Sequence, residues 1–252
     1  MEILLDMHTH TLASGHAYST IAEVAAAAAG QGLCAVGITE HAPNMPGTCH
    51  QFYFQNLKVI PRMMNGIYVL FGAELNIIDY EGHVDLPEET LAGLDVTIAS
   101  MHPPCLPFGN IDSNTNAVIK AMENPYIDII GHPDDGRYPL DYERVVKAAK
   151  ATKTLLEINN SSLKPSGFRL NTKENDVKML KLCKQYRVPV ILDSDAHFAD
   201  DVGRMSYALQ VVREVDFPKH LIANVRTKLF FDCLAAKKNQ SGILNNFLDT
   251  RE

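Results

Sequence analysis

Residues 3–10 read Ile-Leu-Leu-Asp-Met-His-Thr-His, a short apolar run that ends in two histidines one residue apart. Side chains on a strand alternate between its two faces, so His8 and His10 point the same way if this stretch is extended. Imidazole nitrogen is a good ligand for zinc, iron, copper and nickel. Ligands that directly follow a buried strand lie at the rim of a sheet or barrel, where α/β enzymes keep their active sites. This stretch therefore predicts a buried strand that carries metal ligands at its end.

An apolar run that ends in a side chain able to bind metal recurs along the chain. Six further runs follow at intervals of roughly 30 residues, the spacing of βα units. These predicted strands span residues 34–39, 67–72, 96–100, 127–131, 154–158 and 188–192. Six of the seven runs end in His, Asp or Glu. A single His-x-His pair also occurs on ordinary half-exposed strands, but the recurrence favours a ligand site.

Most intervals between these runs carry a helical pattern. Thr20 and Glu23 form the sequence signature of a capping box ahead of an alanine-rich stretch. Helices are predicted over residues 20–29, 51–64 with a break at Pro61, 116–123, 141–151 and 174–186. After His197 only helices are expected, at 200–212, 218–225 and 239–248, with a weak strand near Leu229. Alternating strands and helices predict an α/β fold: a closed or nearly closed TIM-like parallel barrel, with a doubly wound open sheet as the alternative.

Length and composition fit one domain of this kind. The chain has 252 residues, and no linker or low-complexity segment divides it, so a single domain over residues 1–252 is expected. A formal net charge of −7 disfavours a broad nucleic-acid-binding surface. No run approaches the roughly 18 to 20 apolar residues of a membrane span, and residues 1–6 lack the features of a signal peptide. We therefore expect a cytoplasmic protein that does not bind a membrane.

Histidines gather at the predicted strand ends. Seven of the ten lie there, namely His8, His10, His16, His41, His102, His132 and His197, whereas His50, His83 and His220 lie in the intervals and are assigned no chemistry. Loops after different strands of a parallel barrel converge on one face, so the seven imidazoles should meet there with Glu74 and Asp195. A catalytic zinc usually takes three protein ligands, so this set fits two or three ions better than one. Glu74 could bridge two ions through its two oxygens.

The same residues lie in recognisable short motifs. In chain order these are Asp6-Met7-His8-Thr9-His10, Thr39-Glu40-His41, Gly72-Ala73-Glu74, Met101-His102, Gly131-His132-Pro133 and Ser194-Asp195-Ala196-His197. Together they resemble the polymerase-and-histidinol-phosphatase (PHP) family, and the likeness runs from about Asp6 to His197. Residues 16–20 and 156–162 most resemble the stand-alone bacterial phosphatases of the YcdX type within that family.

The resemblance implies a distorted seven-stranded (β/α) barrel that holds three divalent ions. Zinc is the expected metal, with manganese and iron as the alternatives. Carried over by motif, the ligand sets are His8, His10, Glu74 and Asp195 for one ion, Glu74, His102 and His132 for a second, and His16, His41 and His197 for the third. Glu74, Asp195 and His197 are predicted to act in catalysis.

The chain departs from the family pattern at two positions. Family members often carry Gly where this chain has Asp193, and Asp where it has Glu40. Neither is predicted to touch a proposed ligand. Asp193 is expected either to orient an imidazole or to be a solvated rim residue, with no preference between the two. Asp6 has the better case as such a partner, because an unpaired carboxylate at a buried strand end would be costly.

A centre of several ions with oxygen and nitrogen ligands suits phosphoryl transfer. We expect a phosphatase in which a metal-activated hydroxide attacks a small phosphate monoester. Additional positive charge for the phosphate could come from cations that are otherwise solvated surface residues, namely Arg62, Arg137, Lys164, Arg169 and Arg204. Asn160 and Ser162 are candidate polar contacts.

Three alternatives remain at this stage. The first is a phosphatase specific for histidinol phosphate. The second is an amidohydrolase-type C–N hydrolase, a class that commonly has a bridging lysine at the fourth strand end, where this chain has Met101-His102. The third is a non-catalytic PHP-like module that supports a polymerase or binds metal for regulation.

Overall fold

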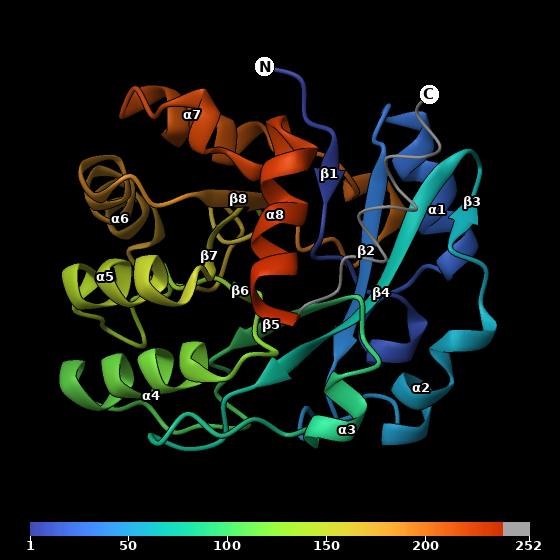
Figure 1. Ribbon diagram of the computed structural model, residues 1–252, viewed down its shortest axis with the longest axis horizontal. Helices are drawn as coiled ribbons and strands as arrows, with labels where there is room; N and C mark the ends of the chain where they lie inside the picture. Colours follow the sequence, from blue (N-terminus) through green and yellow to red (C-terminus); the bar gives the residue numbers. More distant parts are fainter. Residues whose placement is uncertain (239–252) are drawn as a thin grey trace.

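The computed structural model describes residues 1–238 of the chain. Among these residues, seven parallel strands follow one another around a single sheet in their order along the chain (Figure 1). The strands are β1 (Leu5–Asp6), β2 (Ala35–His41), β4 (Ile67–Asn76), β5 (Val96–Ser100), β6 (Ile129–Ile130), β7 (Leu155–Asn159) and β8 (Val190–Asp193). An eighth strand, β3 (Met63–Met64), pairs antiparallel with β4 outside this series.

Helices follow the strands and pack against the sheet. They are α1 (Ile21–Gly30), α2 (Gln51–Asn56), α3 (Glu88–Leu91), α4 (Ile111–Glu123), α5 (Tyr142–Thr152), α6 (Thr172–Tyr186), α7 (Ser206–Glu214) and α8 (Thr227–Lys238). Five 3-10 turns accompany them: η1 (Leu12–Ser14), η2 (Leu57–Val59), η3 (Ala199–Asp201), η4 (Lys219–Leu221) and η5 (Ala223–Val225). The predicted capping box starts α1, since Thr20 accepts from the Glu23 amide and the Glu23 carboxylate accepts from the Thr20 amide at 2.7 Å. None of these helices is long and apolar enough to cross a bilayer.

The barrel closes between its first and last strands through an inserted side chain. His10 donates its amide to the carbonyl of Ala196 at 2.8 Å, just beyond the ends of β1 and β8. Closer to the amino ends of these strands, the side-chain nitrogen Nδ2 of Asn224 donates to the backbone carbonyls of Leu5 (2.8 Å) and Leu192 (2.7 Å). The carboxamide therefore takes the place of direct strand pairing. The fold is a nearly closed, distorted TIM-like barrel, which confirms the predicted architecture over the open sheet.

The amino end of the barrel is filled by α8. Leu5, Val96 and Leu155, from the starts of three strands, belong to one buried apolar cluster with Phe230 and Phe231 of this helix. Figure 1 shows α8 lying across the strands, away from the outer layer formed by α4, α5 and α6. Since apolar side chains close this end, the carboxyl end of the barrel is the end that residues 1–238 leave open for a site.

The segment 51–64 differs from its prediction. The expected helix stops at Asn56, followed by η2, and Met63–Met64 is a strand. Asn65 and Gly66 both have positive φ (50° and 79°), which a two-residue hairpin turn requires. The Asn65-Gly66 pair is the sequence signal for this hairpin. The helical pattern of the preceding residues led to the wrong prediction.

The region after the last strand was also predicted imperfectly. The expected strand near Leu229 is wrong, because this residue lies in α8, which presents Phe230, Phe231 and Leu234 to the barrel. The helix expected at 218–225 is instead the two turns η4 and η5. The helix predicted at 239–248 lies outside the described residues.

Candidate metal centre

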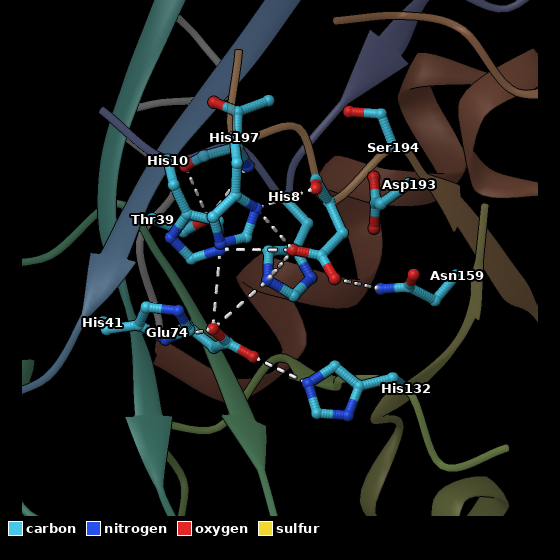
Figure 2. A network of polar contacts seen from close by, with 12 residues as sticks. His8, His10, Thr39, His41, Glu74, His132, Asn159, Asp193, Ser194 and His197 are labelled. Carbon is cyan, nitrogen blue, oxygen red and sulfur yellow. Dashed lines mark hydrogen bonds and ion pairs between the residues drawn. The ribbon is translucent and has the colours of Figure 1, made fainter. Parts of the chain in front are cut away.

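All nine side chains predicted as ligands meet at the carboxyl end of the barrel. His8 and His10 follow β1, His41 ends β2, Glu74 lies in β4, His102 follows β5, His132 follows β6, Asp195 and His197 follow β8, and His16 lies in the loop after η1. Figure 2 shows the rings of His8, His10 and His41 gathered around Glu74. The structure therefore brings together residues that are almost two hundred positions apart.

Glu74 does not stand at the end of its strand, as predicted, but inside β4. That strand runs on to Asn76 and approaches β5 closely, because Gly72 has no side chain: a Cβ there would lie 1.9 Å from the carbonyl oxygen of Val96. Glycine is thus the residue that lets this strand sit where it carries a carboxylate into the barrel mouth.

The two oxygens of Glu74 face different groups of imidazoles. Its Oε2 lies 2.7 Å from His41 Nδ1, 3.4 Å from His8 Nε2 and 3.5 Å from His10 Nε2. Its Oε1 lies 2.9 Å from His132 Nε2 and 3.2 Å from His102 Nε2. This carboxylate has the geometry of a group that can bridge two cations.

Asp195 completes a box of four ligand atoms with Glu74. Its Oδ1 lies 3.6 Å from His8 Nε2 and 3.4 Å from His10 Nε2, close to the separations from Glu74 Oε2. An ion about 2.1 Å from each of four tetrahedral ligands separates those ligands by about 3.4 Å. These four separations therefore match the edges of a tetrahedral site.

The outer part of the cluster is built from three further imidazoles. His16 Nε2 lies 3.2 Å from His41 Nε2, and the ring of His197 lies 5.0 Å from that of His16 and 4.4 Å from that of His10. His16 is exposed and His197 is partly exposed, whereas His41 is buried. These residues lie at the mouth of the site.

The imidazoles are held so that their free nitrogens point into the cluster. His8 Nδ1 lies 2.7 Å from a carboxylate oxygen of Glu157, and His102 Nδ1 lies 2.8 Å from the carbonyl oxygen of the Asn76 side chain. Both partners only accept, so each Nδ1 carries the proton. His10 Nδ1 meets the hydroxyl of Ser14, whose own proton goes to Glu40 at 2.6 Å, so this ring takes the same tautomer.

The free nitrogens then find no proton donor. His8 Nε2, His10 Nε2, His102 Nε2 and Glu74 Oε2 are all buried without a hydrogen-bond partner among the described residues. Such atoms are destabilising unless something compensates them. Because acceptors face acceptors here, the group that fits is a cation, and nitrogen and carboxylate oxygen are ligands that zinc accepts. The residues present therefore fit a metal.

The protonation states agree with this. Burial raises the pKa of Glu74, but the neighbouring His102, His8 and His41 outweigh it and hold the pKa well below its usual value. Burial, together with His41 and His197, holds the pKa of His10 well below its usual value. A charged carboxylate and a neutral imidazole are the forms that bind metal.

His8 lies in the most negative part of the site. Burial lowers its pKa, but Glu157, Glu74 and Asp195 outweigh burial and raise the pKa well above its usual value. The field that favours a proton on this ring also favours a cation beside it.

Two of the predicted ligands have strained backbones. His132 and Asp195 have φ of 29° and 52°, a region that non-glycine residues rarely adopt. The His132 amide donates to Glu157 at 2.5 Å, which holds this conformation. Strain of this kind is concentrated at functional sites.

A cavity of about 680 Å³ opens above the cluster. Of the five cations predicted to serve a phosphate, Arg169, Arg137 and Lys164 line it, while Arg62 pairs with Asp95 elsewhere and Arg204 is exposed outside the lining. Arg169 is almost fully buried, and its Nη1 donates to Asp195 (3.2 Å) and Ser162 (2.9 Å). Ser162 also lines this cavity, whereas Asn160 accepts from the amides of Tyr207 and Ala208.

Comparison with known proteins identifies the fold family. A model of the PHP domain matches residues 6–163, well over half of the chain. The chain belongs to the PHP domain family. It is 46% identical over 237 residues to a probable phosphatase of Clostridium novyi (strain NT), covering 94% of this chain and 96% of that one. A probable phosphatase of Caldicellulosiruptor bescii is also 46% identical, over 234 residues, covering 93% and 96%.

The fold of this PHP domain is shared by solved structures at low identity. The histidinol phosphate phosphatase from Lactococcus lactis subsp. lactis Il1403, solved with zinc, L-histidinol and phosphate, superposes with a TM-score of 0.61. It is 18% identical, and the match covers 85% of this chain and 94% of that chain. The family match ends at residue 163, yet the barrel continues through β8, which carries Asp195 and His197 into the same cluster.

Asp6 and the two positions noted in the sequence as departures from the family pattern, Asp193 and Glu40, are all buried. Asp6 accepts from the amide and hydroxyl of Ser194, so it holds the β8 loop rather than an imidazole. Asp193 accepts from the Met7 amide at 2.7 Å and is fully buried, which excludes the solvated-rim alternative. Glu40 accepts a hydrogen bond from the Ser14 hydroxyl, which in turn contacts His10 Nδ1.

Sequence reasoning missed the residues that orient the rings. Glu157, Ser14 and Asn76 were not singled out, although each holds a predicted ligand. Glu157 carried a signal, since a charged residue between Leu156 and Ile158 in a buried strand requires a partner. The three excluded histidines do lie elsewhere: His50 caps α2, His83 pairs with Asp79, and His220 is exposed in η4.

Proposed function

We propose that this chain is a metal-dependent phosphatase that hydrolyses small phosphate monoesters at a centre of three divalent ions. The observation that carries the proposal is the set of buried nitrogen and carboxylate acceptors that face one another without a proton donor from any residue in the described part of the chain. The phosphatase names of relatives 46% identical over nearly the whole chain support the reaction class. We propose further that residues 1–252 act as one domain.

Each ion has its own set of ligands in this proposal. The sets are His8, His10, Glu74 and Asp195 for the first ion, Glu74, His102 and His132 for the second, and His16, His41 and His197 for the third. Zinc is the proposed metal, since the donors are imidazole and carboxylate without thiolate; manganese and iron accept the same donors. Bound divalent ions lower the pKa of water, which makes hydroxide available near neutral pH.

Three residues are assigned catalytic roles by their position. Glu74 spans the two inner ligand sets, so its two oxygens fix the distance between them. Asp195 faces the ligands of the first ion with Oδ1 and pairs with Arg169 through Oδ2. His197 donates from Nδ1 to the Asp195 carbonyl at 3.1 Å, which leaves Nε2 as its free nitrogen at the mouth.

Arg169 is the cation best placed to contact the phosphate. It lines the cavity beside Asp195, and burial leaves its guanidinium poorly hydrated. A guanidinium binds phosphate oxygens through several N–H groups at fixed angles. We propose that it orients the ester over the ligand cluster and offsets charge that develops on the phosphate.

The experiment is a panel of phosphate esters tested with protein stripped by a chelator and then reloaded with zinc, manganese or iron. The panel contains a generic phosphomonoester, a diester, histidinol phosphate and a dihydropyrimidine amide. We expect hydrolysis of monoesters that is lost on stripping and restored on reloading. Cleavage of the amide alone would support the amidohydrolase alternative, and no cleavage by the loaded protein would support a non-catalytic module.

Two variants test the site itself. Loss of a residue that only orients a metal ligand typically lowers activity about 10- to 100-fold. Loss of a ligand itself should have a larger effect, so His8→Ala should lower kcat by more than about 100-fold. Bound metal should fall with it. His220→Ala is the control, because this exposed histidine lies outside the cavity lining, and it should leave kcat and metal content unchanged. Full turnover in the His8 variant would contradict the site.

A further inference from the structure

One wall of the cavity carries an exposed aromatic ring. Phe168 lines the cavity and is 71% exposed, which is unusual for a phenylalanine. The guanidinium of Arg137 lies 5.0 Å from the centre of this ring and 5.9 Å from that of Phe108. Contacts within about 6 Å of a ring centre are in the range of cation–π attraction. The wall is therefore made of flat groups that contact one another.

The backbone beneath this wall is tied in place. The Gly136 amide donates to the Leu170 carbonyl at 2.7 Å, which joins the loop after β6 to the loop after β7. A Cβ on Gly136 would lie 2.6 Å from that oxygen, so only glycine allows this approach. Asn175 adds a bond to the carbonyl of Asp134 at 2.8 Å. Arg137 and Phe168 are thus held side by side before any ligand arrives.

Arg137 is already paired with a carboxylate on one edge of its guanidinium. Its Nε and Nη2 donate to both carboxylate oxygens of Asp135 at 2.6 to 3.0 Å, and Asp135 is buried. This pair uses the edge of the guanidinium formed by Nε and Nη2. The flat face of the same guanidinium lies over the Phe168 ring, and such a face stacks on π systems.

The wall stands next to the place where the ester would lie. The guanidinium of Arg169 is 5.3 Å from the Phe168 ring, and the same guanidinium donates to Asp195 at 3.2 Å. A phosphate that contacts Arg169 would therefore lie near the Phe168 ring, within reach of the leaving group of the ester.

We infer that Phe168 and Arg137 form the binding site for the leaving group, and that it selects phosphate monoesters whose leaving group carries a flat, uncharged, unsaturated ring close to the ester oxygen. This inference rests on the proposed phosphatase function. A flat ring can stack on the exposed face of Phe168. A positively charged ring is disfavoured, because Arg137 and Arg169 both lie within about 5.3 Å of Phe168 and would repel it.

The experiment compares two esters that differ only in the ring. Benzyl phosphate has a flat aromatic ring, and cyclohexylmethyl phosphate has a puckered saturated ring of similar size on the same kind of primary alcohol. Stacking on Phe168 should raise kcat/KM for the benzyl ester about five- to tenfold over its partner, chiefly through a lower KM. Equal kcat/KM values for the two esters would overturn the inference.

Variants locate the preference on Phe168. Phe168→Leu keeps apolar volume but removes the π face, so the ratio of the two kcat/KM values should fall to about one- to twofold. Phe168→Tyr keeps the face and should keep the ratio. Phe52→Leu is the matched control, because Phe52 is equally exposed (72%) but lies on α2 outside the cavity lining, and this variant should change neither value. A preference that persists in Phe168→Leu would overturn the assignment.

A binding measurement separates failure of the inference from failure of the proposed function. Benzylphosphonate and cyclohexylmethylphosphonate cannot be hydrolysed, and calorimetry with the metal-loaded protein compares their affinities directly. Absence of turnover for all esters, with benzylphosphonate bound preferentially and the preference lost in Phe168→Leu, would overturn the phosphatase but keep the ring site. Equal or absent binding of the two phosphonates would overturn the ring site, whether or not esters are cleaved.

Discussion

Toward the amino end of the barrel, Leu5 and Met7 are fully buried and belong to the apolar cluster that includes Phe230 and Phe231 of α8. Directly after them in the sequence, at the carboxyl end, His8 and His10 are buried just as completely. There the free nitrogens meet other acceptors.

The comparison shows that burial contributes differently to the two ends. Burying apolar surface stabilises the amino end by roughly 25 cal/mol per Å². Burying unpaired polar atoms destabilises the carboxyl end of the protein without metal, and a bound cation would reverse that effect. Substitutions at the two ends should therefore separate stability from metal binding.

The largest expected effect on stability comes from the apolar end. Phe230→Ala removes a fully buried ring and should lower the free energy of unfolding by about 3 to 5 kcal/mol, measured by urea denaturation. The metal content and kcat of the folded protein should stay at their original values, because this ring lies at the other end of the barrel. Phe52→Ala, which truncates an exposed ring, is the control and should change the free energy of unfolding by less than about 0.5 kcal/mol. A Phe230 variant that folds stably but loses its metal would contradict the claim that the amino end does not influence metal binding.

A smaller effect, on metal affinity, is expected from substituting Glu157, which holds His8 and His132 at the carboxyl end. Its carboxylate accepts from His8 Nδ1 (2.7 Å), the His132 amide (2.5 Å) and the Asn159 side chain (3.0 Å). Glu157→Gln keeps the size but turns an NH2 group toward N–H donors. Metal affinity, measured by competition with a chromophoric chelator, should fall about 10- to 100-fold.

The control for Glu157 is Glu143→Gln on the exposed face of α5, which should leave metal affinity unchanged. Unchanged affinity in the Glu157 variant would mean that the orientation of His8 does not depend on this carboxylate.

The smallest effect on stability should come from the mouth of the site. His16 is exposed, so His16→Ala should change the free energy of unfolding by less than about 0.5 kcal/mol. Elemental analysis should nevertheless find one ion fewer per chain, since this residue belongs to the proposed third ligand set. A loss of all bound metal would show that the three ligand sets do not fill independently.

The fold was largely predictable because the strands are short apolar runs that end at regular intervals. Residues 96–100 were predicted without error, and α1 and α5 began within one residue of the expected position because their caps, Thr20 and Asp141, are local signals. The errors fall where tertiary contacts decide. The apolar residues around Leu229 suit a strand or a helix, and in the structure they lie in α8, which packs Phe230 and Phe231 against the amino end of the barrel.

The predicted ligands of the site could be identified from the sequence, but the residues that orient them could not. Side chains after parallel strands converge, so the nine predicted donors could be found by position alone. Which atoms hold them could not, because Ser14 reaches His10 through a local turn and Asn76 reaches His102 from the neighbouring strand β4. Those pairings depend on register and side-chain direction, which the sequence does not state.

The most direct test of the metal centre is anomalous X-ray scattering at the zinc absorption edge from crystals of the zinc-loaded protein. The account predicts three anomalous peaks among His8, His10, His16, His41, Glu74, His102, His132, Asp195 and His197, with Glu74 in contact with two of them. A zinc-replete crystal with no anomalous peak within this set, or with the imidazole nitrogens bonded to protein donors instead, would contradict it.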